Sequence, residues 1–139
     1  GIYNCYNGGI IAKEVSNRVG GICCGIAGDT KVKNNYNLNE VFGTSLVGGV
    51  LGYYTEVALR GAFVKDCYSI SEPLFGQTLP SEIETSNNGL INTDQTFPDS
   101  TPYVDLLSAL NAWVDANKGT YPELKNWVMG DDDYPVFEE

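Results

Sequence analysis

Apolar residues along this chain occur in short stretches that are separated by clusters of Gly, Asn, Asp, Ser or Lys. The first half contains, for example, IYNCY, GIIA and VGGICCGIAG. Short apolar stretches bounded by turn-forming residues are typical of β-strands. Almost all of the 16 glycines lie in the first ninety residues, and glycine pairs favour tight corners over helices. The pattern therefore predicts many short strands joined by turns.

Two signatures recur in this region. Aligning the tyrosines gives a shift of 30 residues between the first two copies and of 32 between the second and third. Four successive columns of the alignment are Asn4, Asn34 and Asp66; Cys5, Asn35 and Cys67; Tyr6, Tyr36 and Tyr68; and Asn7, Asn37 and Ser69. The phrase VGGI at residues 19–22 also returns as VGGV at residues 47–50. Two signatures in the same order with nearly the same period indicate an internal repeat.

A period near 30 residues that holds about three short strands suits one rung of a parallel β-solenoid, in which successive rungs pair about 4.8 Å apart. We therefore predict a mainly β fold, a β-solenoid of about two to three rungs over residues 1–80. Like residues would then stack on like: Tyr6, Tyr36 and Tyr68 as an aromatic ladder, and Asn4, Asn34 and Asp66 as a chain of side-chain hydrogen bonds. Both ladders are interpreted as structural. The alternative is an antiparallel β-sandwich plus a helix, which the scarcity of Asn-Gly or Asp-Gly hairpin turns disfavours.

The pattern changes after residue 80. Residues 81–100 are polar and rich in turn formers, and we predict a polar connector. Residues 101–139 are predicted to form one helix and a short terminal hairpin, packed with the repeats as one domain. The helix would have Ser100 or Thr101 as its cap, Pro102 in its first turn and Gly119 as its stop. Its apolar stripe comprises Val104, Leu106, Leu107, Leu110, Trp113 and Val114, and we expect that stripe to cap or flank the last rung.

Charge narrows the partners that we expect. Eighteen Asp and Glu against eight Lys and Arg give a net charge of −10, which repels nucleic acid and anionic membrane surfaces. No apolar run approaches the roughly 20 residues needed to cross a bilayer, so membrane insertion is not expected. The chain has no histidine, which excludes imidazole bases and imidazole metal ligands.

Candidate chemistry is sparse. The carboxylates of the repeat region are Glu14, Asp29, Glu40, Glu56, Asp66 and Glu72, and they do not recur as the matched pair that a glycosidase needs. We assign no catalytic, cofactor-binding or metal-ligating residue. The adjacent Asp131, Asp132 and Asp133 offer oxygen ligands for Ca²⁺ but lack the spacing of an EF-hand loop, so no cofactor is expected and a calcium site is the lesser alternative. The four cysteines show no CxxC spacing. We predict buried free thiols, with one disulfide and then a metal site as the lesser alternatives.

An exposed aromatic pair is the best candidate for ligand binding. Tyr53 and Tyr54 follow the second VGG signature, and carbohydrate subsites favour exposed aromatic rings. Packing between repeats is the competing role of this pair and the one that we favour.

The phrases GIYNCYNGGI, VGGICCGIAG, KNNYN, VGGVLGY and KDCYS resemble the GLUG-type repeats of large bacterial surface proteins, over about residues 1 to 70. The later LLSALNAWV, NWV and YPVF look like the ending that follows such repeats. Two positions depart from the family pattern, because residue 35 is Asn in place of Cys and ISEPLFGQ replaces a third VGG. The departures fit the C-terminal end of a longer repeat array.

The resemblance implies a non-catalytic extracellular display module at the bacterial cell surface, with a structural or adhesive role. Its partners would be a host or neighbouring-cell glycan or protein, together with preceding repeats of the same parent chain. The alternatives are a fragment of a polysaccharide-acting β-helix enzyme and a pure assembly or capping module. For the latter we expect weak self-association through an open strand edge.

Overall fold

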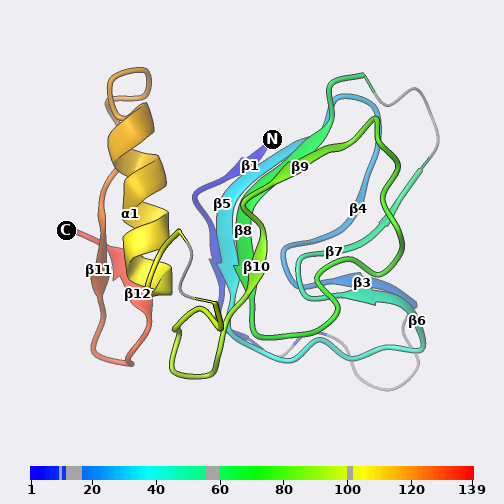
Figure 1. Cartoon of the computed structure of the whole chain (residues 1–139), viewed down its shortest axis with the longest axis horizontal. Helices are drawn as coiled ribbons and strands as arrows, with labels where there is room; N and C mark the ends of the chain where they lie inside the picture. Colours follow the sequence, from blue (N-terminus) through cyan, green and yellow to red (C-terminus); the bar gives the residue numbers. More distant parts are fainter. Residues whose placement is uncertain (10, 12–16, 56–59, 100–101) are drawn as a thin grey trace.

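The computed structural model describes residues 1–9, 11, 17–55, 60–99 and 102–139, and it shows a mainly β protein with one helix (Figure 1). The strands are β1 (Ile2–Tyr3), β2 (Tyr6–Asn7), β3 (Asn17–Gly20), β4 (Cys23–Ile26), β5 (Lys31–Asn37), β6 (Ser45–Gly48), β7 (Leu51–Tyr54), β8 (Phe63–Ser69), β9 (Glu84–Ser86), β10 (Gly89–Leu90), β11 (Trp127–Met129) and β12 (Pro135–Phe137). Helix α1 (Leu106–Asn117) precedes β11.

The chain passes through three parallel sheets in a fixed order and then returns to the first. The first sheet contains β1 and β2, then β5, then β8, and last β9 and β10; the second pairs β3 with β6, and the third pairs β4 with β7. Tyr6 lies opposite Tyr36 and Tyr36 opposite Tyr68, so the alignment made from the sequence is confirmed residue by residue. The described strands of successive passes pair in parallel, not in the antiparallel arrangement that was the alternative.

Every pass through the first sheet has a break at the same position. Asn4, Asn34, Asp66 and Asn87 all have left-handed backbone, with φ between 52° and 54°. Asn and Asp tolerate this conformation better than other side-chain-bearing residues, which explains the short polar residue in this column. The amide of Asn34 donates to Asn4 Oδ1 over 2.7 Å, and the amide of Asn87 donates to Asp66 Oδ1 over 3.1 Å. The predicted bond is confirmed between Asn4 and Asn34, but no described hydrogen bond joins the side chains of Asn34 and Asp66, and Asp66 is paired with the unpredicted Asn87 instead.

The residue after this break has a second role that the sequence alignment did not show. The side chain of Asn35 accepts a hydrogen bond from the backbone N–H of Cys5 (2.8 Å) and donates one to the carbonyl of Ile2 (3.1 Å). Asn88 makes the same pair of bonds to Cys67 and Val64. These amides replace sheet hydrogen bonds where the left-handed residue interrupts the pairing. Asn35, which stands where the family pattern has Cys, therefore has a structural role.

The repeat continues beyond the point where its sequence signatures end. Gly49 donates its backbone N–H to Pro73 (2.7 Å) and Val50 donates to Leu74 (2.9 Å), so ISEPLFGQ follows the path that a third VGG would take. Within the segment predicted as a polar connector, β9 and β10 pair with β8. Gly89 occupies the tyrosine position of this fourth pass, and the ring of Phe97 packs against Tyr68 with centroids 5.2 Å apart. Sequence analysis missed these strands because their residues are polar.

Two apolar clusters form the core. One lies between the sheets and includes Val32, Val64, Val50, Leu51 and Cys67. The other lies between the first sheet and the C-terminal region, and its buried members are Tyr36, Tyr68, Ile91, Leu106, Ala109, Leu110, Trp113, Val114 and Trp127. The two faces of the first sheet are thus covered by different partners, the inner face by the other sheets and the outer face by α1 and β11.

Helix α1 begins later than the sequence analysis predicted. Its N-cap is Asp105, whose carboxylate accepts the backbone N–H of Ser108 over 2.8 Å. Pro102 and Val104 precede the helix, and Val104 is 65% exposed, so neither belongs to the buried stripe. Ser100 and Thr101 lie outside the described residues. A backbone bond from Leu106 to the carbonyl of Gln95 (2.9 Å) and a bridge between Thr96 and Asp105 hold the chain extended up to this point, which prevents an earlier start. The helix ends at Asn117 with Lys118 as its C-cap, one residue before Gly119.

The C-terminal region lies along the outer face of the first sheet, as Figure 1 shows for α1, β11 and β12. The predicted antiparallel hairpin is confirmed, since β11 pairs with β12. Trp127 is 1% exposed, its ring centroid is 5.5 Å from that of Tyr36, and its indole N–H donates to Asn4 Oδ1 over 2.8 Å. The helix and hairpin therefore bind the side of the sheet and do not cover its last strand as a cap would.

Candidate functional site

The outer face of the first sheet is divided into two halves by the left-handed residues. One half carries Tyr6, Tyr36 and Tyr68 beneath α1 and β11; we call it the covered half. The other half carries Tyr3, Lys31, Lys33, Phe63 and Lys65, all of them half-buried or exposed; we call it the open half. Tyr3 lies opposite Lys33, Lys33 opposite Lys65, and Lys31 opposite Phe63. Two of these three facing pairs join unlike residues, and the third places two lysines side by side.

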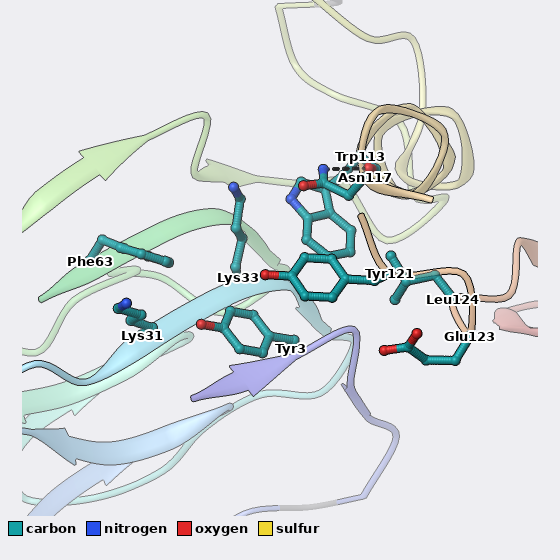
Figure 2. Close-up of a pocket in the computed structure, with 9 residues that line it drawn as sticks. All are labelled: Tyr3, Lys31, Lys33, Phe63, Trp113, Asn117, Tyr121, Glu123 and Leu124. Carbon is teal, nitrogen blue, oxygen red and sulfur yellow. Dashed lines mark hydrogen bonds between the residues drawn. The ribbon is translucent and has the colours of Figure 1, made fainter. Parts of the chain in front are cut away.

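A pocket of about 370 Å³ lies between the open half and the end of the helix. We call it the sheet–helix pocket. Figure 2 shows the residues that line it: Tyr3, Lys31, Lys33 and Phe63 from the strands, and Trp113, Asn117, Tyr121, Glu123 and Leu124 from α1 and the segment after it. The hydroxyl ends of Tyr3 and Tyr121 point toward the side occupied by Lys31 and Phe63 (Figure 2). Its volume lies in the range of small-molecule sites, about 300–1,000 Å³.

Positive charge is concentrated around one aromatic ring of this pocket. The ammonium groups of Lys31, Lys33 and Lys65 lie 5.9, 5.8 and 5.1 Å from the centroid of Phe63. Lys65 is paired with Glu84, whereas neither Lys31 nor Lys33 forms an ion pair with any residue that the structure describes. Like charges on facing positions of a sheet are destabilising. This arrangement is therefore not what strand pairing alone would favour.

Trp113 forms the inner wall of the pocket. It is 8% exposed, and the ammonium of Lys33 lies 5.6 Å from its ring centroid. Its indole N–H is buried and has no hydrogen-bond acceptor among the described residues, although buried polar groups are nearly always paired. The carbonyl of Trp113 accepts the side-chain amide of Asn117 over 2.8 Å, which fixes the end of the helix beside the pocket.

The pocket joins flat apolar rings to two cations and one carboxylate, Glu123. Aromatic faces bind apolar faces of a ligand, ammonium groups bind its anionic oxygens, and tyrosine hydroxyls bind polar groups at its rim. With one acid among its lining residues, it does not contain the pair of carboxylates on which glycoside hydrolysis depends. These lining residues are suited to binding a small ligand.

The tyrosine pair predicted from the sequence lies elsewhere. Tyr53 and Tyr54 are in β7, in the third sheet, and are half-buried. Tyr54 packs against the inner core cluster, whereas the guanidinium of Arg18 lies 4.9 Å from the ring centroid of Tyr53. Gly25 faces Tyr53, and a Cβ on that glycine would come within 2.3 Å of the ring. The two rings therefore do not combine into one binding surface, which agrees with the packing role.

The acidic candidates are dispersed. Asp131, Asp132 and Asp133 are exposed in the turn between β11 and β12, and the hydroxyl of Tyr134 donates to Asp132 over 3.4 Å. Among the described residues no group of three Asp, Glu or Cys side chains is arranged to hold a metal ion. Asp29, Glu40 and Glu72 are exposed and Asp66 is buried; Glu14 and Glu56 lie outside the described residues. A calcium site stays a prediction.

All four cysteines are free, but only Cys67 is buried. Cys5 and Cys24 are exposed, so the prediction of mostly buried thiols was wrong for them. Cys5 is exposed because it lies on the edge of the first sheet, next to β1 and β2. Burial raises the pKa of the thiols of Cys23 and Cys67 to about 12, which keeps both protonated and unreactive at neutral pH.

Sequence reasoning missed every residue of the sheet–helix pocket. The strands contributed a signal, because Tyr3 is replaced by Lys33 and Lys31 by Phe63 between copies, while the tyrosine column is constant over the first three passes. When the residue type at one aligned position differs between stacked copies, packing against the neighbouring copies does not determine that residue type. Trp113 and Tyr121 gave no such signal, since their position beside the strands depends on how the helix packs.

No protein-family model, curated protein or solved structure matches the chain. The resemblance to GLUG-type repeats accordingly rests on the quoted motifs. Within the described residues, no helix has the length and apolar character needed to cross a membrane.

Proposed function

We propose that the chain is a non-catalytic module of an extracellular bacterial surface protein, built on a parallel β-solenoid and used to display a binding surface. The observation that carries this proposal is the register of the first sheet, in which Tyr6, Tyr36 and Tyr68, and Asn7, Asn37 and Ser69, lie opposite one another in successive passes. Stacked repeats of this kind give extended surfaces on which sites are built.

Hydrogen bonds support the solenoid part of the proposal. The amide of Asn7 donates to Asn37 Oδ1 over 2.8 Å, and the amide of Asn37 donates to the hydroxyl of Ser69 over 3.1 Å. Each of these side chains also accepts a backbone N–H two residues further on, from Gly9, Asn39 and Ser71. The same side chain thus bonds to the backbone of its own turn and to the equivalent side chain of the next pass. Further copies of the repeat can be added with the same bonds, which favours a stacked array.

The adhesive part of the proposal is supported by the sheet–helix pocket. The pocket opens beside the repeats. Substitution of its lining residues does not remove the side chains of the tyrosine and asparagine ladders. The target that we propose is a glycan or protein of a host or a neighbouring cell, and the module acts outside the cell on the resemblance described above. Structural display without any ligand is the competing role.

Binding of the intact chain to an array of host glycans and matrix proteins, with and without Ca²⁺, tests the proposal. We expect selective, saturable binding that is lost when the chain is unfolded by heat. A blank array with well-folded protein would overturn the adhesive role. Dependence on Ca²⁺ would assign the binding to Asp131, Asp132 and Asp133. Release of new reducing ends or unsaturated sugars from any polysaccharide on the array would overturn the non-catalytic assignment.

A second candidate function, assembly, is favoured by the edge of the first sheet. Strands β1 and β2 form the outer strands of that sheet, and Tyr3 and Tyr6 beside them are 42% and 40% exposed. An edge strand offers unpaired backbone groups to another chain. For this candidate we expect weak, concentration-dependent self-association in sedimentation experiments. A strictly monomeric profile at high concentration would exclude it.

A further inference from the structure

The unneutralised lysines of the sheet–helix pocket identify the class of ligand that the pocket takes. Counting only residues that line it, Lys31 and Lys33 contribute two positive charges and Glu123 one negative charge, so the local balance is +1 in a chain whose total is −10. The surrounding negative field repels polyanions. A ligand with a single negative charge is therefore the best electrostatic match.

The rings of the pocket specify what must accompany that charge. Tyr3, Phe63, Trp113 and Tyr121 present flat faces, and Tyr3 and Tyr121 add hydroxyl groups on the same side as Lys31 (Figure 2). A pyranose ring has one apolar C–H face for stacking and hydroxyl groups at its rim, whereas a carboxylate on a flexible peptide side chain would leave the rings uncovered. The combination of stacking surface, rim hydroxyls and one anion-binding group fits an acidic sugar.

We propose that the sheet–helix pocket binds a carboxylated sugar residue of a glycan, a hexuronic acid or a sugar acid of similar size. Its carboxylate is held by Lys33 with Lys31 nearby, and its ring lies against the aromatic walls. Lys33 lies over Trp113 and Phe63, and it has no carboxylate partner in the part of the chain that the structure describes. When it turns toward the ligand, a carboxylate oxygen becomes the acceptor that the indole N–H of Trp113 lacks. This inference names the ligand class for the adhesive role proposed above and rests on it.

Titration of the intact chain with a disaccharide that ends in glucuronic acid tests the proposal, with the matching disaccharide that ends in glucose as comparison. Binding is followed by calorimetry and by tryptophan fluorescence. We expect the acidic disaccharide to bind at least about ten-fold more tightly than the neutral one, because one charge-assisted hydrogen bond has roughly that effect. Raising the salt concentration should weaken binding of the acidic sugar alone.

Two variants separate the parts of the site, and a third is a control. Lys33→Gln should lower affinity for the acidic disaccharide about ten-fold and leave the neutral one unchanged. Tyr121→Ala removes a ring that is 47% exposed, and it should lower the affinity for both disaccharides. Arg18→Gln removes the same unit of charge beside Tyr53, in the other sheets, and should change neither affinity by more than about two-fold. Thermal unfolding of each variant establishes that it is folded before its binding is compared.

The outcomes are distinguishable. Equal affinity for the two disaccharides, or no effect of Lys33→Gln in a folded protein, overturns the inference. Inorganic phosphate or acetate that binds as tightly as the acidic sugar reduces the pocket to a plain anion site, and an acidic peptide that binds as tightly makes it a peptide site; both overturn it. A chain that recognises only neutral glycans or matrix proteins retains the adhesive function and loses this ligand. A chain that binds nothing loses both.

Discussion

The covered and open halves of the first sheet share the same strands and follow different rules. In the covered half the tyrosine recurs in each of the first three passes, Tyr6 stacks on Tyr36 with centroids 5.3 Å apart, and Tyr36 is wholly buried. In the open half the facing residues are Tyr3, Lys33 and Lys65. The left-handed residue and the residue after it separate the two halves. Within one strand, therefore, the constant tyrosine column packs against the helix and hairpin, whereas the open-half columns, which change from Tyr3 to Lys33 and from Lys31 to Phe63, line the pocket.

The C-terminal region therefore has two roles: one part covers the tyrosine column, and another forms one side of the sheet–helix pocket. Leu106, Leu110 and Val114 seal the tyrosine column and are fully buried. Trp113, at the boundary, belongs both to that core and to the pocket wall. Four predictions test this division of the sheet, in order of decreasing effect.

Trp127→Ala should break the covered half. The ring contacts Tyr6, Tyr36 and Phe137, with centroid distances of 6.0, 5.5 and 4.3 Å, and its loss leaves a cavity between hairpin and sheet. We expect the free energy of unfolding to fall by about 3–5 kcal/mol, measured by urea denaturation. Val128→Ala, at an exposed position of the same strand, is the matched control and should cost less than about 0.5 kcal/mol. Equal effects of the two changes would refute the division.

Asn35→Cys tests whether repetition always favours stability, because Cys is the residue of the neighbouring copies at Cys5 and Cys67. The change removes the hydrogen bonds to Cys5 N–H and the Ile2 carbonyl. We expect a loss of about 1–3 kcal/mol in reducing buffer, where no disulfide forms. Asn17→Cys, at an exposed position of β3, is the control. A neutral or stabilising effect at residue 35 would show that the amide bridge is dispensable.

High pH should destabilise the fold through the buried tyrosines of the covered half, in addition to the buried thiols of Cys23 and Cys67, whose pKa is also raised. Burial, and secondarily the neighbouring Tyr6, raises the pKa of Tyr36, and burial with the nearby Asp66 raises that of Tyr68. The folded state then retains these protons above pH about 10, where unfolded tyrosine loses them. Stability is complete below that pH and falls as the pH rises, by up to about 1.4 kcal/mol per pH unit for each group. Urea denaturation between pH 7 and 11.5 measures the loss, which Tyr36→Phe should reduce. A pH-independent free energy over this range would contradict the burial argument.

Lys33→Gln should leave the fold nearly unchanged. The side chain forms no ion pair with a described residue and faces Lys65 across the strands, so its removal relieves repulsion and loses a contact with Trp113. We expect the free energy of unfolding to stay within about 0.5 kcal/mol of the wild-type value. A loss above 2 kcal/mol would make Lys33 part of the structural half and remove the basis for the ligand proposal.

Much of the β architecture was predictable, for reasons that are local. Glycine pairs, left-handed asparagines and recurring tyrosines each require a particular backbone, and stacking copies of one backbone requires parallel register. The hairpin of β11 and β12 followed from two short apolar stretches around an acidic turn. The fourth pass was missed because Glu84, Thr85 and Ser86 contribute backbone pairing without apolar side chains. Phe97, from later in the chain, packs against the tyrosine of the preceding pass.

What the sequence by itself determined was therefore the repeat: its period, its register and the columns that stack. These follow from periodic residues whose conformational preferences act within a few positions of the chain. Tertiary packing sets the position of the helix and brings Trp113 and Tyr121 together with Lys31 and Lys33 in one pocket. Those contacts join residues about eighty positions apart. They depend on which apolar surfaces of the whole molecule pack together, and no pattern of neighbouring residues specifies that packing.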